Sequence, residues 1–143
     1  GGNKEEIYKF KKKNTNKNLF LNENIPYAGL PKVMLKMDIL TIPYTKIIKS
    51  GGGVDEISKY TSPLKLFDYL ACGKIIISSD LKVFREVINS RNAYFVKNYE
   101  NIFEWKKNIK MAKNNKKKNL IMSINNFRLS KKYDHFKRVK RYI

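Results

Sequence analysis

Two short apolar runs without polar alternation constrain the fold of this chain most strongly. They are Asp38 to Pro43, which reads Asp-Ile-Leu-Thr-Ile-Pro, and Lys74 to Ser79, which reads Lys-Ile-Ile-Ile-Ser-Ser. A strand covered on only one face alternates apolar and polar side chains, whereas a parallel strand covered on both faces is apolar almost throughout. Each run is therefore predicted to be a strand of a parallel sheet that lies between two layers of helices.

The segment between these strands ends in the most clearly marked helix of the chain, Ser62 to Gly73. Serine favours the N-cap, proline the first helical position and glycine the position after the last turn. A long loop over residues 44–61, which contains Gly51-Gly52-Gly53, precedes this helix. Loops of that length in a compact domain are usually functional or mobile.

The remaining chain continues the alternation of helices and strands. Asp80 is expected to cap a helix on which Val83, Phe84, Val87 and Ile88 share a face. Further helices are predicted over Lys4 to Lys13 and Leu30 to Met37, and further strands over Leu19 to Leu21 and Ala93 to Val96. From Asn98 to the end the pattern predicts helix, with breaks near Asn114-Asn115 and Ser130. The pattern predicts an α/β fold, a Rossmann-like parallel sheet with helices on both faces.

Length and composition exclude several classes of protein. With 143 residues, 42% of them hydrophobic, the chain can form one domain with a substantial core. One cysteine, Cys72, and one histidine, His135, leave no disulfide framework or zinc cluster. No apolar run approaches the roughly 18 residues of a membrane-spanning helix, and no signal segment opens the chain. We expect a cytoplasmic protein without a bound metal or cofactor.

The formal net charge of +19 indicates a polyanionic partner, although a Lys/Asn/Ile bias of the genome would raise it equally. Much of it lies in a basic helical tail at about 98–143. Attachment of this tail to the inner face of an anionic membrane is one interpretation. The plainer one is that its apolar residues pack on the sheet with the lysines outward. A dedicated nucleic-acid surface is less expected, because no nucleic-acid-reading motif is present.

Three polar residues near the start of the predicted helix suggest an anion site. Ser62, Lys65 and Asp68 are spaced by three and so lie along one side of a helix. Free N–H groups at a helix start and a lysine suit a phosphate, and a carboxylate can accept hydrogen bonds from sugar hydroxyls. Alternatively, Ser62 only caps the helix, and Lys65 and Asp68 form an exposed intrahelical pair that binds nothing.

The stretch Tyr60 to Val87 resembles the donor-binding signature of GT-B glycosyltransferases of the group 1 type. That signature reads Ser-Pro-x-Lys-x-(Phe/Leu)-Glu-Tyr-x-Ala-x-Gly-Lys-Pro, then an apolar strand, Ser-Asp and a helix with Arg-Glu. The matching residues here are Ser62-Pro63, Lys65, Asp68-Tyr69, Ala71, Gly73-Lys74, Ser79-Asp80 and Arg85-Glu86. Weaker similarity extends upstream over Leu30 to Tyr44 and downstream over Tyr133 to Arg138.

The resemblance implies a nucleoside-diphosphate sugar as donor and a glycan, lipid or polysaccharide as acceptor. The diphosphate would contact Ser62, Pro63, Leu64 and Lys65, with Lys65 stabilising the leaving group, and the ribose would contact Asp68. The base would lie near Ile25. For the loop with Gly52 and Gly53 two interpretations stay open: it closes over the donor sugar, or it is a flexible surface loop without a role in binding. Two positions depart from the pattern: Tyr60 replaces a glutamate that contacts the sugar, and Asp68 replaces a glutamate.

The same resemblance implies that part of the domain is missing at its N-terminus. The family's first strand–helix unit, its second strand and its acceptor-binding domain have no counterpart here, so this chain alone is expected to be inactive. The resulting open sheet edges favour a homodimer or a rearranged strand order. An inactive truncated fragment and a basic nucleic-acid-binding module remain the alternatives to a transferase.

Overall fold

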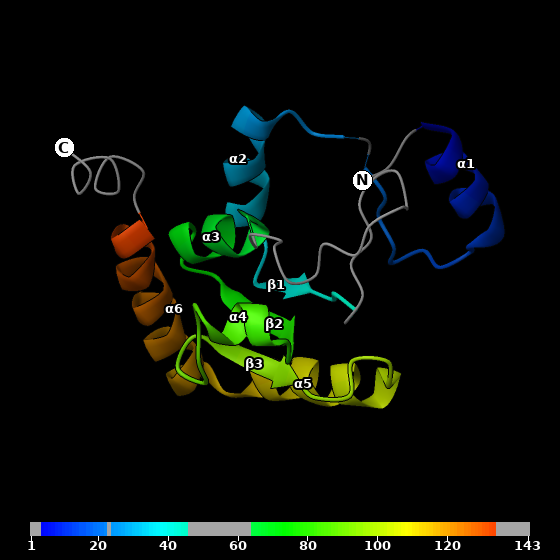
Figure 1. Cartoon of the computed structure of the whole chain (residues 1–143). Helices are drawn as coiled ribbons and strands as arrows, with labels where there is room; N and C mark the ends of the chain where they lie inside the picture. The colour runs from blue at the N-terminus through cyan, green and yellow to red at the C-terminus, as the bar shows by residue number, and fades with distance from the viewer. Residues whose placement is uncertain (1–3, 23, 46–63, 134–143) are drawn as a thin grey trace. The chain divides into compact units, whose positions relative to one another are not determined.

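The computed structural model describes residues 4–22, 24–45 and 64–133 (Figure 1). The chain divides into two compact units, Gly1–Val33 and Met34–Ile143. The predicted site residues Ser62, Pro63, Gly52 and Gly53 lie outside the described residues, as does His135.

The first unit contains α1 (Lys4–Lys13), the 3₁₀ turn η1 (Tyr27–Gly29) and the first residues of α2 (Leu30–Leu35). The helix predicted over Lys4 to Lys13 is confirmed, with Ile7 buried. The strand predicted over Leu19 to Leu21 is wrong, because this segment is irregular and Phe20 is 83% exposed. Asparagine side chains explain the error: the Oδ1 atoms of Asn14 and Asn16 accept hydrogen bonds from backbone N–H groups two residues on, which holds the chain in consecutive turns.

The second unit is built on a three-stranded parallel sheet of β1 (Ile39–Ile42), β2 (Ile75–Ser79) and β3 (Ala93–Val96), in that order. In register, Thr41 lies beside Ile77, and Ile77 beside Tyr94. The α/β class and the three predicted strands of this unit are therefore confirmed. The strands follow chain order, so no rearrangement is seen among them, and the homodimer stays a prediction.

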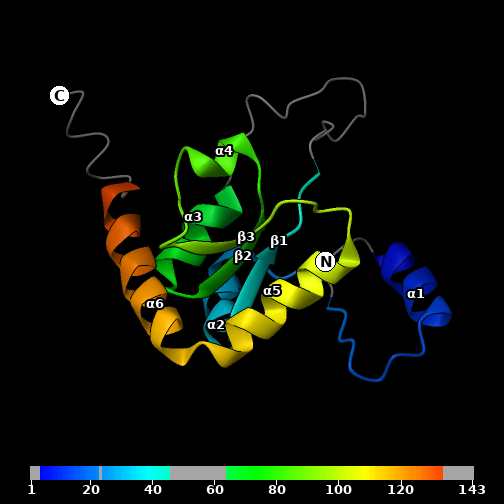
Figure 2. The same cartoon turned by 90° about the horizontal axis from the view of Figure 1, so that it is seen from below.

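Helices cover both faces of this sheet (Figure 2). They are α3 (Leu64–Ala71), α4 (Lys82–Arg85), α5 (Ile102–Asn114) and α6 (Lys116–Ser130), followed by the 3₁₀ turn η2 (Lys131–Tyr133). Successive residues of β2 point to opposite faces. Ile76 packs with Leu66, Leu70 and Phe84 under α3 and α4, whereas Ile77 packs with Ala112 and Met122 from α5 and α6. Two apolar clusters, one on each face, hold the layers together.

Gly73 ends α3 as the sequence predicts. Its φ of +60° is the left-handed conformation that glycine adopts most readily. The N–H of Gly73 donates to the carbonyl of Leu70 (3.0 Å), and the N–H of Lys74 donates to that of Tyr69 (3.4 Å). This pair of bonds is a Schellman motif, and it turns the chain directly from α3 into β2.

Asp80 does not cap a helix, contrary to the sequence prediction. The N-cap of α4 is Leu81, and no side chain bonds the free N–H groups there. The Asp80 carboxylate instead forms an ion pair with Arg85, whose Nε lies 2.5 Å from Oδ1. The two breaks predicted in the C-terminal helices are confirmed, since α5 ends at Asn114 and α6 ends at Ser130.

The helix α6 crosses the amino edge of the sheet. Its buried Asn126 donates through Nδ2 to the carbonyl of Lys74 (2.9 Å), which precedes β2, and to that of Asn92 (3.0 Å), which precedes β3. Ser123 donates to the carbonyl of Gly73 (2.5 Å) in the same region. The carboxyl edge of the sheet therefore lies at the other end of the strands from these contacts of Ser123 and Asn126.

Candidate functional site

The candidate site lies at the carboxyl edge of the sheet. In open parallel sheets, ligands bind beyond the carboxyl ends of the strands. The described residues that follow the three strand ends there are Pro43 to Thr45 after β1, Asp80 after β2 and Lys97 after β3. The first turn of α3 belongs to this edge too, because α3 runs back toward the start of β2.

A lysine and a tyrosine from two separate segments meet at this edge. The Nζ of Lys65, in the first turn of α3, lies 5.6 Å from the centre of the Tyr44 ring. Such a cation–π contact contributes about 0.5 to 1 kcal/mol at an exposed site. Lys65 is exposed and Tyr44 half-buried, so the ring orients the lysine stem and leaves the ammonium group accessible to an anion.

The Tyr44 ring is itself held by the core. The centre of the Tyr44 ring lies 5.7 Å from that of Phe84, a fully buried residue of α4. Because Phe84 anchors Tyr44 and Tyr44 contacts Lys65, the position of the lysine depends on core packing as well as on α3.

Asp68 lies one turn further along α3 and is half-buried. Its charge affects two neighbours. Burial raises the pKa of Tyr69, and the nearby Tyr44 and Asp68 raise it further. Burial also raises the pKa of the Cys72 thiol, with Asp68 adding to the rise and Lys74 opposing it. Cys72 therefore stays a thiol at neutral pH, which is a poor nucleophile.

Asp80 and Arg85 form a closed pair at the end of β2. Two hydrogen bonds join them, from Nε to Oδ1 (2.5 Å) and from Nη2 to Oδ2 (2.9 Å). The pair lowers the pKa of Asp80 below its usual range. The guanidinium also stacks on Phe95, with its central carbon 3.5 Å from the ring centre. Arg85 is thus engaged on two sides, and Lys65 is the better placed cation for a ligand.

The structure brings together part of the predicted site. Lys65 and Asp68 lie on one helix at the expected edge, and Leu64, at 72% exposed, opens that helix. Ile25 belongs to the first unit, half-buried with its Cγ2 close to Gly29, and its role at a base stays a prediction. Within the described segments, no cluster of three or more His, Cys, Asp or Glu side chains could hold a metal ion.

Tyr44 is a site residue to which the sequence analysis gave no role of its own. Its position directly after the apolar run Asp38 to Pro43 was the available signal, since that position is at the carboxyl end of a strand. The contact with Lys65 could not be inferred, because the two residues are separated by a long loop.

Comparison with models of known protein families gives no match to this chain, and a search of curated proteins finds no significantly similar sequence.

Proposed function

We propose that this chain binds the nucleoside-diphosphate part of a sugar donor and serves as the donor-binding part of a glycosyltransferase. In this proposal the diphosphate contacts Lys65 and the start of α3, and the ribose hydroxyls donate hydrogen bonds to Asp68. The sugar passes to a glycan, lipid or polysaccharide acceptor that binds to a partner domain.

One observation supports the proposal most directly: an exposed lysine at the carboxyl edge of a parallel sheet, held by an aromatic ring and followed one turn later by a carboxylate. A preorganised cation stabilises the negative charge that develops on a departing diphosphate. The carboxylate would repel a phosphate placed beside it but suits a sugar with two hydroxyls. Along α3 the positive Lys65 is followed by the negative Asp68, and this order matches a diphosphate followed by a ribose in a nucleoside diphosphate.

Isothermal titration of uridine and guanosine diphosphates into the parent chain and into Lys65→Ala tests the proposal. A hydrogen bond to a charged group contributes about 1.5 to 3 kcal/mol, so the variant should bind roughly 10- to 150-fold more weakly. Lys113→Ala, which removes a lysine near the end of α5, is the matched control and should bind as the parent does.

Equal affinity of the parent and Lys65→Ala would contradict the proposal. Absence of nucleotide binding combined with strong, steeply salt-dependent binding of nucleic acid would favour the basic nucleic-acid module instead.

A further inference from the structure

The outward side of α6 carries a continuous stripe of exposed apolar residues. Residues three, four and seven apart share one side of a helix. The members of this α6 stripe are Leu120 (64% exposed), Ile121 (53%), Ile124 (43%) and Phe127 (49%). The plainer expectation, that the apolar residues of the tail pack on the sheet with the lysines outward, therefore holds for Met122 of α6 but not for these four residues. A contiguous exposed apolar patch on a folded chain indicates a contact surface.

Basic residues flank the stripe at both ends. Lys116 and Lys117 lie in the first turn of α6, and Arg128 and Lys131 follow its centre, all of them exposed. From residue 105 to residue 133 the sequence contains ten lysines and arginines and no aspartate or glutamate. The surface is therefore apolar at its centre and positive at its ends, without a negative charge of its own.

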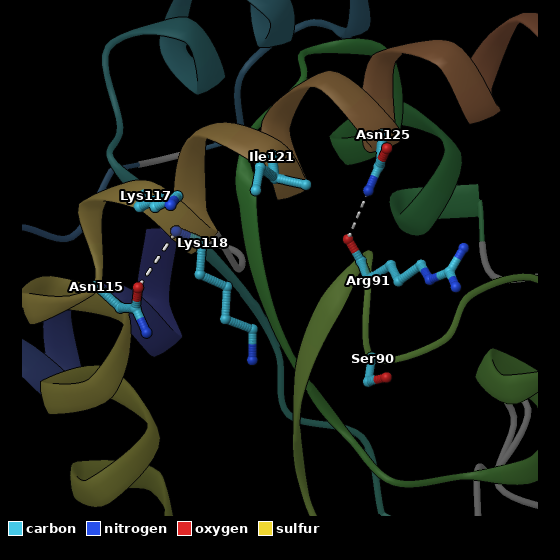
Figure 3. A pocket seen from close by; sticks show the side chains of 7 residues that line it. All are labelled: Ser90, Arg91, Asn115, Lys117, Lys118, Ile121 and Asn125. Atoms are coloured by element: carbon cyan, nitrogen blue, oxygen red, sulfur yellow. Dashed lines mark hydrogen bonds between the residues drawn. The ribbon is translucent and has the colours of Figure 1, made fainter.

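A hollow of about 410 Å³ adjoins the stripe, between the first half of α6 and the turn before β3 (Figure 3). Ile121, Lys117 and Lys118 line it from α6, and Arg91 lines it from the turn. Figure 3 shows the charged ends of Lys118 and Arg91 directed to different sides of the hollow. Cations that do not converge on one point suit a layer of negative charges better than a single bound phosphate.

We propose that α6 lies in the plane of an anionic bilayer surface. The stripe would enter the boundary between headgroups and acyl chains, and the flanking cations would contact lipid phosphates. None of the described helices is long and apolar enough to cross a bilayer, so contact by α6 would be in-plane.

The charge and the side-chain chemistry of the α6 stripe favour a bilayer over other binding partners of this surface. A second copy of α6 packed on the first would bring its lysines and arginines close to like charges. A nucleic acid would satisfy the charges but would leave exposed aliphatic side chains such as Ile124 without a partner. An anionic bilayer satisfies both properties of the surface.

Sedimentation of the full chain with vesicles tests the proposal. The vesicles are phosphatidylcholine alone or with about one third phosphatidylglycerol. The parent should bind only the anionic vesicles. Ile121→Ser/Ile124→Ser should lower the partition coefficient about tenfold or more, because exposed apolar side chains are lost without disturbing the core. Lys116→Gln/Lys117→Gln should lower it about fivefold per charge removed.

Phe103→Ser is the matched control, because Phe103 is an apolar residue of α5 that is 73% exposed and lies outside the stripe. This variant should bind vesicles as the parent does. Failure of the parent to bind anionic vesicles, equal binding to both compositions, or unchanged binding by the two double variants would overturn the proposal. So would a dimer in light scattering that Ile121→Ser/Ile124→Ser abolishes, because the occupant would then be a second copy.

The proposal does not depend on nucleotide binding. The α6 stripe belongs to the helix that crosses the amino edge of the sheet, and Lys65 lies at the carboxyl edge. Vesicle binding should therefore persist in Lys65→Ala.

Discussion

The side chain of Asn92 donates a hydrogen bond through Nδ2 to the Oδ1 of Asn126, across 3.0 Å. Asn126 returns two bonds through its own Nδ2, to the carbonyls of Asn92 and Lys74. Asn126 is fully buried and Asn92 is 6% exposed. One carboxamide thus joins α6 to the starts of both β2 and β3, and no water need enter to satisfy these groups.

Replacement of Asn126 with leucine should destabilise the fold strongly. The change removes these partners from the buried carbonyl and amide of Asn92 and from the part-buried carbonyl of Lys74. Each unsatisfied group costs about 1 to 3 kcal/mol, so the free energy of unfolding should fall by about 3 kcal/mol in urea titrations. Asn125→Ala is the control, because the bond that Asn125 Nδ2 donates to the Arg91 carbonyl is long, at 3.5 Å, and exposed. A loss below about 1 kcal/mol for Asn126→Leu would show that the network contributes little.

Gly73→Ala should destabilise the chain because of backbone conformation, with little steric effect. A Cβ at Gly73 would lie 3.5 Å or more from the nearest atoms, which is ordinary contact. Its φ of +60°, however, costs a residue with a Cβ about 1 to 2 kcal/mol. Asparagine tolerates this conformation better, so Gly73→Asn should lose less than Gly73→Ala in thermal or urea unfolding. Equal losses for both variants would indicate a clash instead.

The pair of Asp80 and Arg85 should make stability depend on pH in the acid range. Because the pKa of Asp80 is lowered in the folded chain, the folded state holds fewer protons than the unfolded state between the two values. The pair's contribution is present above the ordinary pKa of an aspartate, about 3.9, and is lost as pH falls through the lowered pKa. For a partly exposed pair we expect about 0.5 to 1 kcal/mol.

Urea midpoints of the parent and of Asp80→Asn at neutral and acid pH measure this contribution. The parent should be the more stable at pH 7, and the difference should shrink at acid pH. Arg85→Gln should give the same pattern, since it removes the other half of the pair. A difference between parent and Asp80→Asn that is constant over this pH range would show that the ion pair is not its source.

Under the proposed function, Asp68→Asn should abolish discrimination between ribose and deoxyribose. A carboxylate accepting from two hydroxyls should favour a nucleoside diphosphate over its 2′-deoxy form by about 1.5 to 3 kcal/mol. The variant should bind both forms with similar affinity in titration calorimetry. If the parent binds nucleotides without preferring ribose, Asp68 has another role and only the diphosphate part of the proposal survives.

Local sequence signals predicted much of the second unit. The apolar runs around Ile39 and Ile76, and the glycine after α3, act within a few residues, and the structure has the strands and the helix end where they were expected. The predictions were wrong where a polar side chain forms its hydrogen bonds with a partner other than the one expected from the sequence. The asparagines before Leu19 bond the local backbone, and Asp80 bonds Arg85 instead of the helix start.

The sequence by itself determined the alternation of helices and strands, because strand periodicity, helix caps and the left-handed glycine are properties of neighbouring residues. It also determined which residues of α3, Lys65 and Asp68, lie on one side of a helix. Only the tertiary structure decided that Tyr44 supports Lys65, that Asn126 joins two strand starts, and that Ile124 faces outward. These features depend on contacts between residues far apart in the chain. A periodic pattern shows which side of a helix or strand is apolar, but it does not specify which distant residue packs against that side.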